Sequence, residues 1–389
     1  MITKFKLIPK YYLGQNVVID YLPKELKKHQ VKTALLVAGG GSIKRNKLYD
    51  HIKAACKRAH VKLIEHWGIE PNPRDEGIYR AALLARKTHC DLIIAAGGGS
   101  VIDAAKVVGI VAKNPVYKDA WSYVLDNSRI TKPSIPLFSI ITLAATGSEN
   151  NAGSVINNAK TSLKYSVETK SAIPLVCFED PMYTMTLSPW QTACGIFDVF
   201  SHLMEQYYDS ATHMFAWTQQ YLLASMKVVV NCANRLAKNN SDYLARTELL
   251  WTSSMALNNL GTIQTNGGDW MTHRLEHAVS ALWDVEHGAG LALICPTYLY
   301  YMCNVKKNKI FIAKSLEIGQ NVFQVKTLSA YFKKLNEFIA LLKLPKRYGD
   351  FNNVKNVSDA NIQFLNKHFN GVVRNKQDMA KYVFSHIKP

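Results

Sequence analysis

DLIIAAGGGSVIDAAKVVGIVA, residues 91–112, is the stretch of the sequence that decides the fold. Its first six residues form a short apolar run that predicts a buried β-strand, and residues 101–112 predict a helix. The glycines and serine between them, residues 97–100, are typical of a strand-to-helix turn. Asp103 and Lys106 interrupt the apolar sequence, so this stretch does not predict a membrane-spanning helix.

The same order of elements recurs along the first half of the chain. Residues 33–38 (TALLVA) form a short apolar run that ends in the glycine turn 39–42 (GGGS). Further strands are expected at residues 61–66 and 136–143, and a helix at residues 78–87. Short apolar strands that alternate with helices predict βαβ units and a parallel sheet covered on both faces.

The sequence changes character around residues 181–189, where two prolines occur. Residues 190–260 contain long stretches rich in Ala, Leu, Met and aromatic residues, and residues 270–282 also favour a helix. We therefore expect an α/β domain over residues 1–182 and an all-helical domain over residues 183–389.

Composition excludes several classes of protein. The 389 residues are 48% hydrophobic, which excludes a disordered chain, and the seven cysteines are scattered without a CxxC pair. This pattern predicts neither a disulfide framework nor a zinc ribbon, and it favours a reducing compartment. With no apolar segment of a signal peptide near the start, we expect a cytoplasmic protein.

The chain is strongly basic, with 47 Lys+Arg against 29 Asp+Glu and a formal net charge of +18. A basic surface attracts phosphate, which suits a nucleic acid or a phosphate-bearing cofactor. The lysines occur in pairs and never in long runs, and no nucleic-acid-binding motif accompanies them. We expect no nucleic-acid partner, although a basic binding protein on a degenerate enzyme fold stays an alternative.

Three turns follow predicted strands and could bind phosphate. In the two GGGS turns, glycines allow close approach of the backbone, and a helix N-terminus favours an anion. The third turn, residues 145–151 (ATGSENN), follows the strand at 136–143, so it would lie at the same edge of the sheet. Turns without a ligand are the alternative, and the Rossmann GxGxxG pattern is absent.

A second group of candidate site residues, one aspartate and four histidines, lies in the helical half of the sequence. Asp198 and His202 are four residues apart, as are His273 and His277, and His287 follows ten residues later. Residues four apart share one face of a helix. A carboxylate and imidazoles on facing helices can bind a divalent metal, and this set suits Fe²⁺ or Zn²⁺. Unrelated surface or core histidines are the alternative reading, since the chain has 12.

With these motifs, the sequence resembles the iron-containing alcohol dehydrogenase family, in its branch of NADPH-dependent butanol dehydrogenases and aldehyde reductases. The matching segments are VAGGGSIKRNKLYD (37–50), IEPNPR (69–74), AAGGGSVIDAAK (95–106), TLAATGSENNAG (142–153), QTACGIFDVFSHLMEQY (191–207) and DWMTHRLEHAVSALWDVEHGAGLALICP (269–296). The resemblance implies a dehydroquinate synthase-like architecture, with a dinucleotide-binding α/β domain and a helical domain that binds metal and carries the catalytic residues. A homodimer is a further implication of the resemblance.

The resemblance also assigns site residues. The metal ligands would be Asp198, His202, His273 and His287, and His277 would be the catalytic histidine that does not bind the metal. The expected cofactor-binding residues are Gly39, Gly40, Ser42, Asn72, Gly98, Gly99, Ser100, Thr142, Leu143, Thr146, Asn151, Lys164 and Tyr183.

The first glycine turn bears on the choice of cofactor. An acidic residue there would accept hydrogen bonds from the 2′-hydroxyl of NAD and repel the 2′-phosphate of NADP. This chain has Gly39, Gly40 and Ser42 instead, followed by Lys44 and Arg45. We therefore expect NADP(H), with a small aldehyde or primary alcohol as the substrate. The alternative within the superfamily is an NAD- and zinc-dependent polyol oxidoreductase similar to glycerol dehydrogenase.

Overall fold

The computed structural model describes residues 9–158, 160–161, 163–210, 214–373 and 375–387. Contacts between residues divide the chain into two compact units. The first runs to Leu187, and it also includes Ser253–Asn258; the second comprises Ser188–Thr252 and the chain from Asn259 onward. The division thus falls later than residue 182, and a short segment from the expected helical domain belongs to the α/β unit.

The first unit contains a six-stranded sheet in which each strand is parallel to its neighbours. The strand order is β1 (Lys10–Leu13), β8 (Val176–Glu179), β5 (Leu137–Ile141), β4 (Leu92–Gly97), β2 (Thr33–Ala38) and β3 (Lys62–His66). The predicted parallel α/β fold is confirmed, and four of these strands lie where the apolar runs predicted them. The four-residue strands β1 and β8 were not anticipated.

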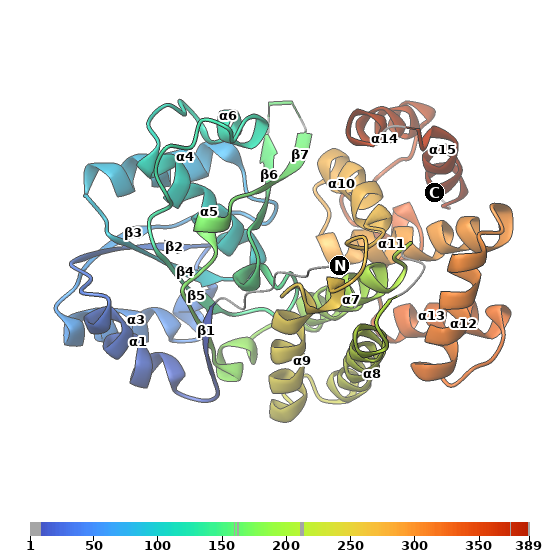
Figure 1. Ribbon diagram of the computed structural model, residues 1–389, viewed down its shortest axis with the longest axis horizontal. Coiled ribbons are helices and arrows are strands. Elements are labelled where there is room, and N and C mark those ends of the chain that lie inside the picture. Colours follow the sequence, from blue (N-terminus) through green and yellow to red (C-terminus); the bar gives the residue numbers. More distant parts are fainter. Residues whose placement is uncertain (1–8, 159, 162, 211–213, 374, 388–389) are drawn as a thin grey trace. The chain divides into compact units, whose positions relative to one another are not determined.

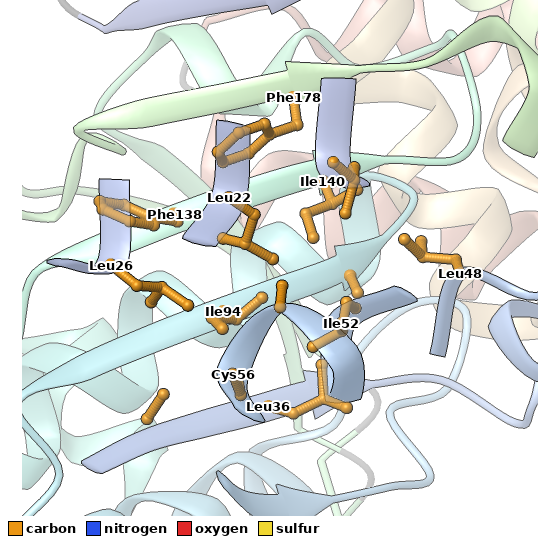
Figure 2. Packing of buried hydrophobic residues seen from close by; sticks show 14 of the residues in the cluster. Leu22, Leu26, Leu36, Leu48, Ile52, Cys56, Ile94, Phe138, Ile140 and Phe178 are labelled. Atoms are coloured by element: carbon orange, nitrogen blue, oxygen red, sulfur yellow. The ribbon is translucent and has the colours of Figure 1, made fainter. Parts of the chain in front are cut away.

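Helices cover both faces of this sheet (Figure 1). α1 (Val17–Lys28) and α3 (Leu48–Ala59) pack on one face, and α4 (Asp75–Lys87) and α5 (Gly99–Lys113) lie on the other. Figure 2 shows the core beneath α1 and α3, where alternate strand residues meet the two helices; it includes Leu22, Leu26, Leu36, Leu48, Ile52, Cys56, Ile94, Phe138, Ile140 and Phe178. Alternate residues share one face of a strand, so a parallel sheet needs apolar residues at almost every position.

Shorter elements complete the unit. They are α2 (Ser42–Arg45), α6 (Ala120–Leu125), the antiparallel hairpin of β6 (Gly153–Asn158) and β7 (Leu163–Glu168), and the 3₁₀ turns Ser148–Asn150, Lys170–Ala172 and Pro181–Thr184. The sequence analysis predicted neither the hairpin nor α6.

The order of the strands determines where the glycine turns lie. β5, β4 and β2 are consecutive in the sheet, so the turns that follow them share its carboxyl edge. β3 pairs with one side of β2 and β4 with the other, so the chain reverses direction across the sheet at this point. Ligands of open α/β sheets bind at such a switch point.

The second unit is helical throughout its described residues. Its helices are α7 (Pro189–Tyr207), α8 (Ala216–Lys238), most of α9 (Tyr243–Ala256), α10 (Met271–Trp283), α11 (His287–Tyr300), α12 (Lys309–Asn321), α13 (Leu328–Leu341), α14 (Asp359–Val372) and α15 (Gln377–His386), with a π-helical turn at Tyr301–Val305 and 3₁₀ turns at Leu260–Thr262 and Tyr348–Asp350.

α7 is the buried centre of this unit. Ser188 and Gln191 form a capping box at its start, and Pro189 occupies the first turn, where its missing N–H costs nothing. Every residue from Thr192 to Tyr207 is buried. Polar side chains on this helix are therefore held inside the domain, where each needs a partner.

Two further observations concern the whole chain. All seven cysteines are buried free thiols. Among the described residues, no helix is both long enough and apolar enough to cross a membrane.

Candidate metal and nucleotide sites

The structure brings the four expected metal ligands together within the helical unit. Asp198 and His202 lie one turn apart on α7, His273 lies on α10, and His287 is the first residue of α11. Asp198 Oδ1 lies 3.4 Å from the Nε2 of His202, 3.7 Å from that of His273 and 3.8 Å from that of His287. One carboxylate oxygen thus faces three imidazole nitrogens.

The donor atoms fit a divalent cation. Asp198 Oδ1 and His273 Nε2 are buried and make no hydrogen bond within the described part of the chain. Buried polar atoms without partners are costly, and an ion between them would satisfy both. Burial alone would raise the pKa of Asp198, but the nearby imidazoles of His202, His287 and His273 outweigh it and hold that pKa below its usual value. The carboxylate is therefore available as an anionic ligand.

Two glutamates that sequence reasoning missed complete this cluster. Glu205 Oε1 lies 2.5 Å from His273 Nδ1, and the Glu276 carboxylate forms a hydrogen bond with His287 Nδ1. Burial acts to lower the pKa of His273, but Glu205 and Asp198 raise it to about 10. A proton and a metal ion therefore compete for this imidazole. The spacing could have revealed Glu205, which is seven residues after Asp198 on the same face of α7.

Glycines allow α11 to begin close to its neighbours. A Cβ atom at Gly288 would lie 2.0 Å from the carbonyl oxygen of Cys194 on α7, and one at Gly290 would lie 2.7 Å from Glu276 Oε1. A side chain at either position would push α11 away. The glycines that follow His287 therefore bring this ligand against α7 and α10.

The turn after β4 packs directly on the turn after β5 in the α/β unit. Gly98 precedes the first turn of α5, and a Cβ atom at Gly99 would lie only 2.3 Å from the Thr146 side chain. A Cβ atom at Gly98 would be 3.4 Å from the Leu143 side chain, and the Thr142 N–H donates to the Gly97 carbonyl. Six of the expected cofactor-binding residues therefore gather at this edge: Gly98, Gly99, Ser100, Thr142, Leu143 and Thr146.

Buried charges on α5 fix the third turn. Lys106 Nζ donates to Ser148 Oγ at 2.8 Å and to the Gly153 carbonyl at 2.6 Å, and Asp103 accepts from the Val155 N–H at 2.8 Å. Asn151 takes part in the same network, since its Oδ1 accepts from the Gly153 N–H and its Nδ2 donates to the Gly147 carbonyl. In this structure the amide of Asn151 holds the turn, and its contact with a cofactor stays a prediction.

The first glycine turn differs from expectation. It leads into α2, which has only four residues and ends before Lys47, where a positive φ of 65° starts α3 in a new direction. The helical stretch after this turn is therefore divided into two helices, α2 and α3. Gly39 lies close to the segment after β3, because its Cβ atom would be 3.2 Å from the Ile69 carbonyl oxygen. Gly40 and Ser42 are exposed beside it.

Of the three remaining residues expected to bind the cofactor, two contact each other and the third lies in the core. Lys164 on β7 donates to Asn72 Oδ1 at 3.0 Å, so two of them meet. Tyr183 is instead buried in the core beneath α1 and α3, with its hydroxyl 2.8 Å from His51 Nδ1. Its role toward a cofactor stays a prediction, since the structure gives it a packing role.

Two family models cover this chain almost completely. The model described as iron-containing alcohol dehydrogenase matches residues 9–181, and the C-terminal model of the Fe-containing alcohol dehydrogenase family matches residues 192–373. The chain belongs to the iron-containing alcohol dehydrogenase family. The resemblance drawn from the motifs is thereby confirmed, and membership implies a metal and a nicotinamide cofactor.

Similar proteins of this family are named for different cofactors, NADH in some and NADPH in others. The chain is 35% identical to NADH-dependent butanol dehydrogenase B of Clostridium acetobutylicum, covering 89% of this chain and 88% of that protein. It is 30% identical to the NADPH-dependent aldehyde reductase YqhD of Escherichia coli, over 82% of this chain and 81% of that protein. The crystal structure of NADH-dependent butanol dehydrogenase A from Thermotoga maritima has a TM-score of 0.90 and 28% identity, covering 100% of this chain and 99% of that one.

His277, the expected catalytic histidine, lies next to the expected metal ligands. It is half-buried on α10, one turn after His273, and its ring centroid lies 5.8 Å from that of His287. Glu276, His277 and His287 also have possible ligand atoms within 4.8 Å of one another. We favour the set around Asp198 for the metal, because Glu276 already bonds the Nδ1 of His287 and the Ser280 hydroxyl.

Proposed function

We propose that this protein is an alcohol dehydrogenase or aldehyde reductase that transfers hydride between NADP(H) and a small aldehyde or primary alcohol, with one Fe²⁺ or Zn²⁺ ion. The observation that carries this proposal is the convergence of Asp198, His202, His273 and His287 on one buried point in a chain of this family. Relatives named butanol dehydrogenase and aldehyde reductase support the reaction class over the polyol and nucleic-acid alternatives.

The four side chains would hold the metal, and the glycine turns would hold the dinucleotide. When bound, the metal supplies a Lewis acid for the carbonyl oxygen and the nicotinamide supplies or accepts hydride. Asp198 contributes a negative charge that stays ionised, while the imidazoles bind without adding charge. His277 would pass a proton between an imidazole nitrogen and the substrate oxygen, directly or through water, since imidazole titrates near neutral pH.

The second and third turns suit the pyrophosphate and the nicotinamide side of the cofactor. Gly98 and Gly99 open α5, a 15-residue helix whose N-terminus favours an anion. Thr142 and Thr146 lie against the same turn and can donate hydroxyl hydrogen bonds. The α5 turn is the stronger phosphate site of the two GGGS turns, because α2 is too short to build a helix dipole.

The preference for NADP(H) rests on the residues around the first turn. Gly39 and Gly40 offer no acid, and the Lys44 ammonium lies 4.2 Å from the centre of the Trp67 ring. The carboxylate of Glu65, on the neighbouring strand β3, already accepts two hydrogen bonds. They come from the Tyr49 hydroxyl and the Trp67 indole, each at 2.8 Å. A 2′-phosphate bound at this turn would therefore lie near the Lys44 ammonium, and the Glu65 carboxylate would already have two hydrogen-bond donors.

Oxidation of NADPH and NADH with butanal tests the proposal on protein stripped of metal and then restored with Fe²⁺ or Zn²⁺. We expect activity with NADPH that returns only with metal. Activity with NADH alone would contradict the cofactor assignment and keep the reaction class. Full activity of the stripped protein would contradict the metal assignment. Size-exclusion chromatography with light scattering tests the homodimer that we also propose.

A further inference from the structure

We infer that Glu205 and Glu276 are positioning residues that orient two of the histidine ligands and strengthen the binding of the divalent metal. This inference rests on the proposed metal site. Each glutamate forms a hydrogen bond with the Nδ1 atom of one ligand, on the side of the ring opposite to Asp198. Neither residue would itself touch substrate or cofactor.

Glu205 is anchored at both oxygens. It is 1% exposed on α7, its Oε1 accepts from His273 Nδ1 at 2.5 Å, and its Oε2 accepts from the Thr272 backbone N–H at 3.1 Å. The backbone N–H of Thr272 belongs to the first turn of α10, where N–H groups lack partners within the helix. The carboxylate therefore fixes the start of α10 and the ring of His273 together.

Glu276 performs the same task one helix further on. It is fully buried on α10, it bonds His287 Nδ1 on α11, and its other oxygen accepts from the Ser280 hydroxyl. Gly290 leaves the space that this carboxylate occupies. A glutamate on α7 thus orients the ligand on α10, and a glutamate on α10 orients the ligand on α11.

The chemistry of imidazole explains why these contacts matter. A neutral imidazole carries one N–H and one acceptor nitrogen, and a carboxylate at Nδ1 requires the N–H to be there. The lone pair then lies at Nε2, and the Nε2 atoms of His273 and His287 both face Asp198 Oδ1. The two buried carboxylates also add negative charge next to the ligands, which favours a dication.

The experiment measures metal affinity without substrate. The full-length protein is stripped of metal, and the dissociation constant for Zn²⁺ is obtained by competition with a chromophoric chelator at neutral pH. We expect Glu205→Gln and Glu276→Gln each to weaken Zn²⁺ binding by about 10- to 100-fold, because the amide keeps an acceptor and loses the charge. Glu317→Gln is the matched control: Glu317 accepts from the Gln219 amide at 3.1 Å, lies on α12 and should leave the affinity unchanged.

Thermal unfolding of the metal-free variants separates positioning from stability. We expect their midpoints to stay near that of the wild type while the Zn²⁺ affinity falls. Unchanged affinity in both variants, with or without a lower midpoint, would overturn the inference. Should both fail to fold, Ser280→Ala decides: it removes one hydrogen bond from Glu276 without touching a charge, and we expect a several-fold loss of affinity. Wild-type hydride transfer is measured separately, so failure of the proposed function is recognised independently.

Discussion

Gly99→Ala tests whether the turn after β4 needs glycine because of its contact with the turn after β5. The added Cβ atom would lie 2.3 Å from Oγ1 and Cγ2 of Thr146 and 2.8 Å from its Cβ. Ordinary contacts between such atoms are about 3.5–4.0 Å, so one turn has to move by about 1 Å. Overpacking of this kind costs about 1–3 kcal/mol, and a displacement of about 1 Å in a positioned group can reduce turnover about 100-fold.

The assay compares the KM for NADPH and kcat with the metal content of the same preparation. We expect Gly99→Ala to raise the KM at least tenfold or to lower kcat by a similar factor, while metal binding in the other unit is unchanged. Gly371→Ala is the control, since it lies on α14 in the other unit, no atom lies within 4 Å of its added Cβ, and its backbone is not in the left-handed region. Wild-type kinetics in Gly99→Ala would refute the reasoning.

Three further predictions concern other residues. His277→Ala should lower kcat at least tenfold while metal analysis shows full occupancy; loss of the metal would mean that the ligands are misassigned. Gly39→Asp should raise the KM for NADPH about tenfold or more relative to NADH, measured with both cofactors, and equal effects on the two would contradict the assigned 2′-phosphate position. Glu179→Gln should stabilise the protein more and more as the pH rises above the ordinary pKa of a glutamate. Burial and the neighbouring Glu149 raise the pKa of Glu179 in the folded protein. Between the ordinary and the raised pKa, the wild type therefore loses about 1.4 kcal/mol of stability per pH unit. Urea-unfolding midpoints across pH test this, and a difference from wild type that does not vary with pH would exclude it.

The prediction for Glu179 rests on the Ser254 hydroxyl, which lies between two glutamates. Ser254 Oγ lies 2.5 Å from Glu179 Oε1 and also bonds Glu149 Oε1, yet a hydroxyl donates only one hydrogen. Glu179 Oε2 makes no hydrogen bond to any residue in the described ranges. A neutral carboxylic acid that donates from Oε1 to Ser254 Oγ resolves the shared hydrogen, and it leaves Oε2 uncharged, which makes its burial less costly.

Local patterns in the sequence predicted the main elements well. The strands at residues 33–38 and 91–96 are each indicated by one continuous apolar run. The ligand pairs Asp198/His202 and His273/His277 follow from the 3.6-residue period of a helix. β1 and β8 have four residues each, which is too short for a period to be recognised. The break between α2 and α3 depends on the positive φ of Lys47, a residue type that does not signal such a turn.

Tertiary structure determined what the sequence could not. Glutamates on helices are common and usually exposed, so nothing in the sequence distinguishes Glu276 from a solvent-facing residue, and only the seven-residue spacing from Asp198 indicates Glu205. Their roles emerge only when α7, α10 and α11 come together. Tyr183 shows the reverse case, because a residue that resemblance assigns to the cofactor has its hydroxyl bound to His51 in the core.

The most direct test of the metal site compares wild type with His273→Ala. Bound Fe²⁺ or Zn²⁺ is measured on purified protein, and NADPH oxidation with butanal is followed on the same samples before and after metal restoration. Our prediction is that the wild type regains activity with metal, and that His273→Ala neither retains the ion nor regains activity. Full activity in a metal-free His273→Ala protein would contradict it.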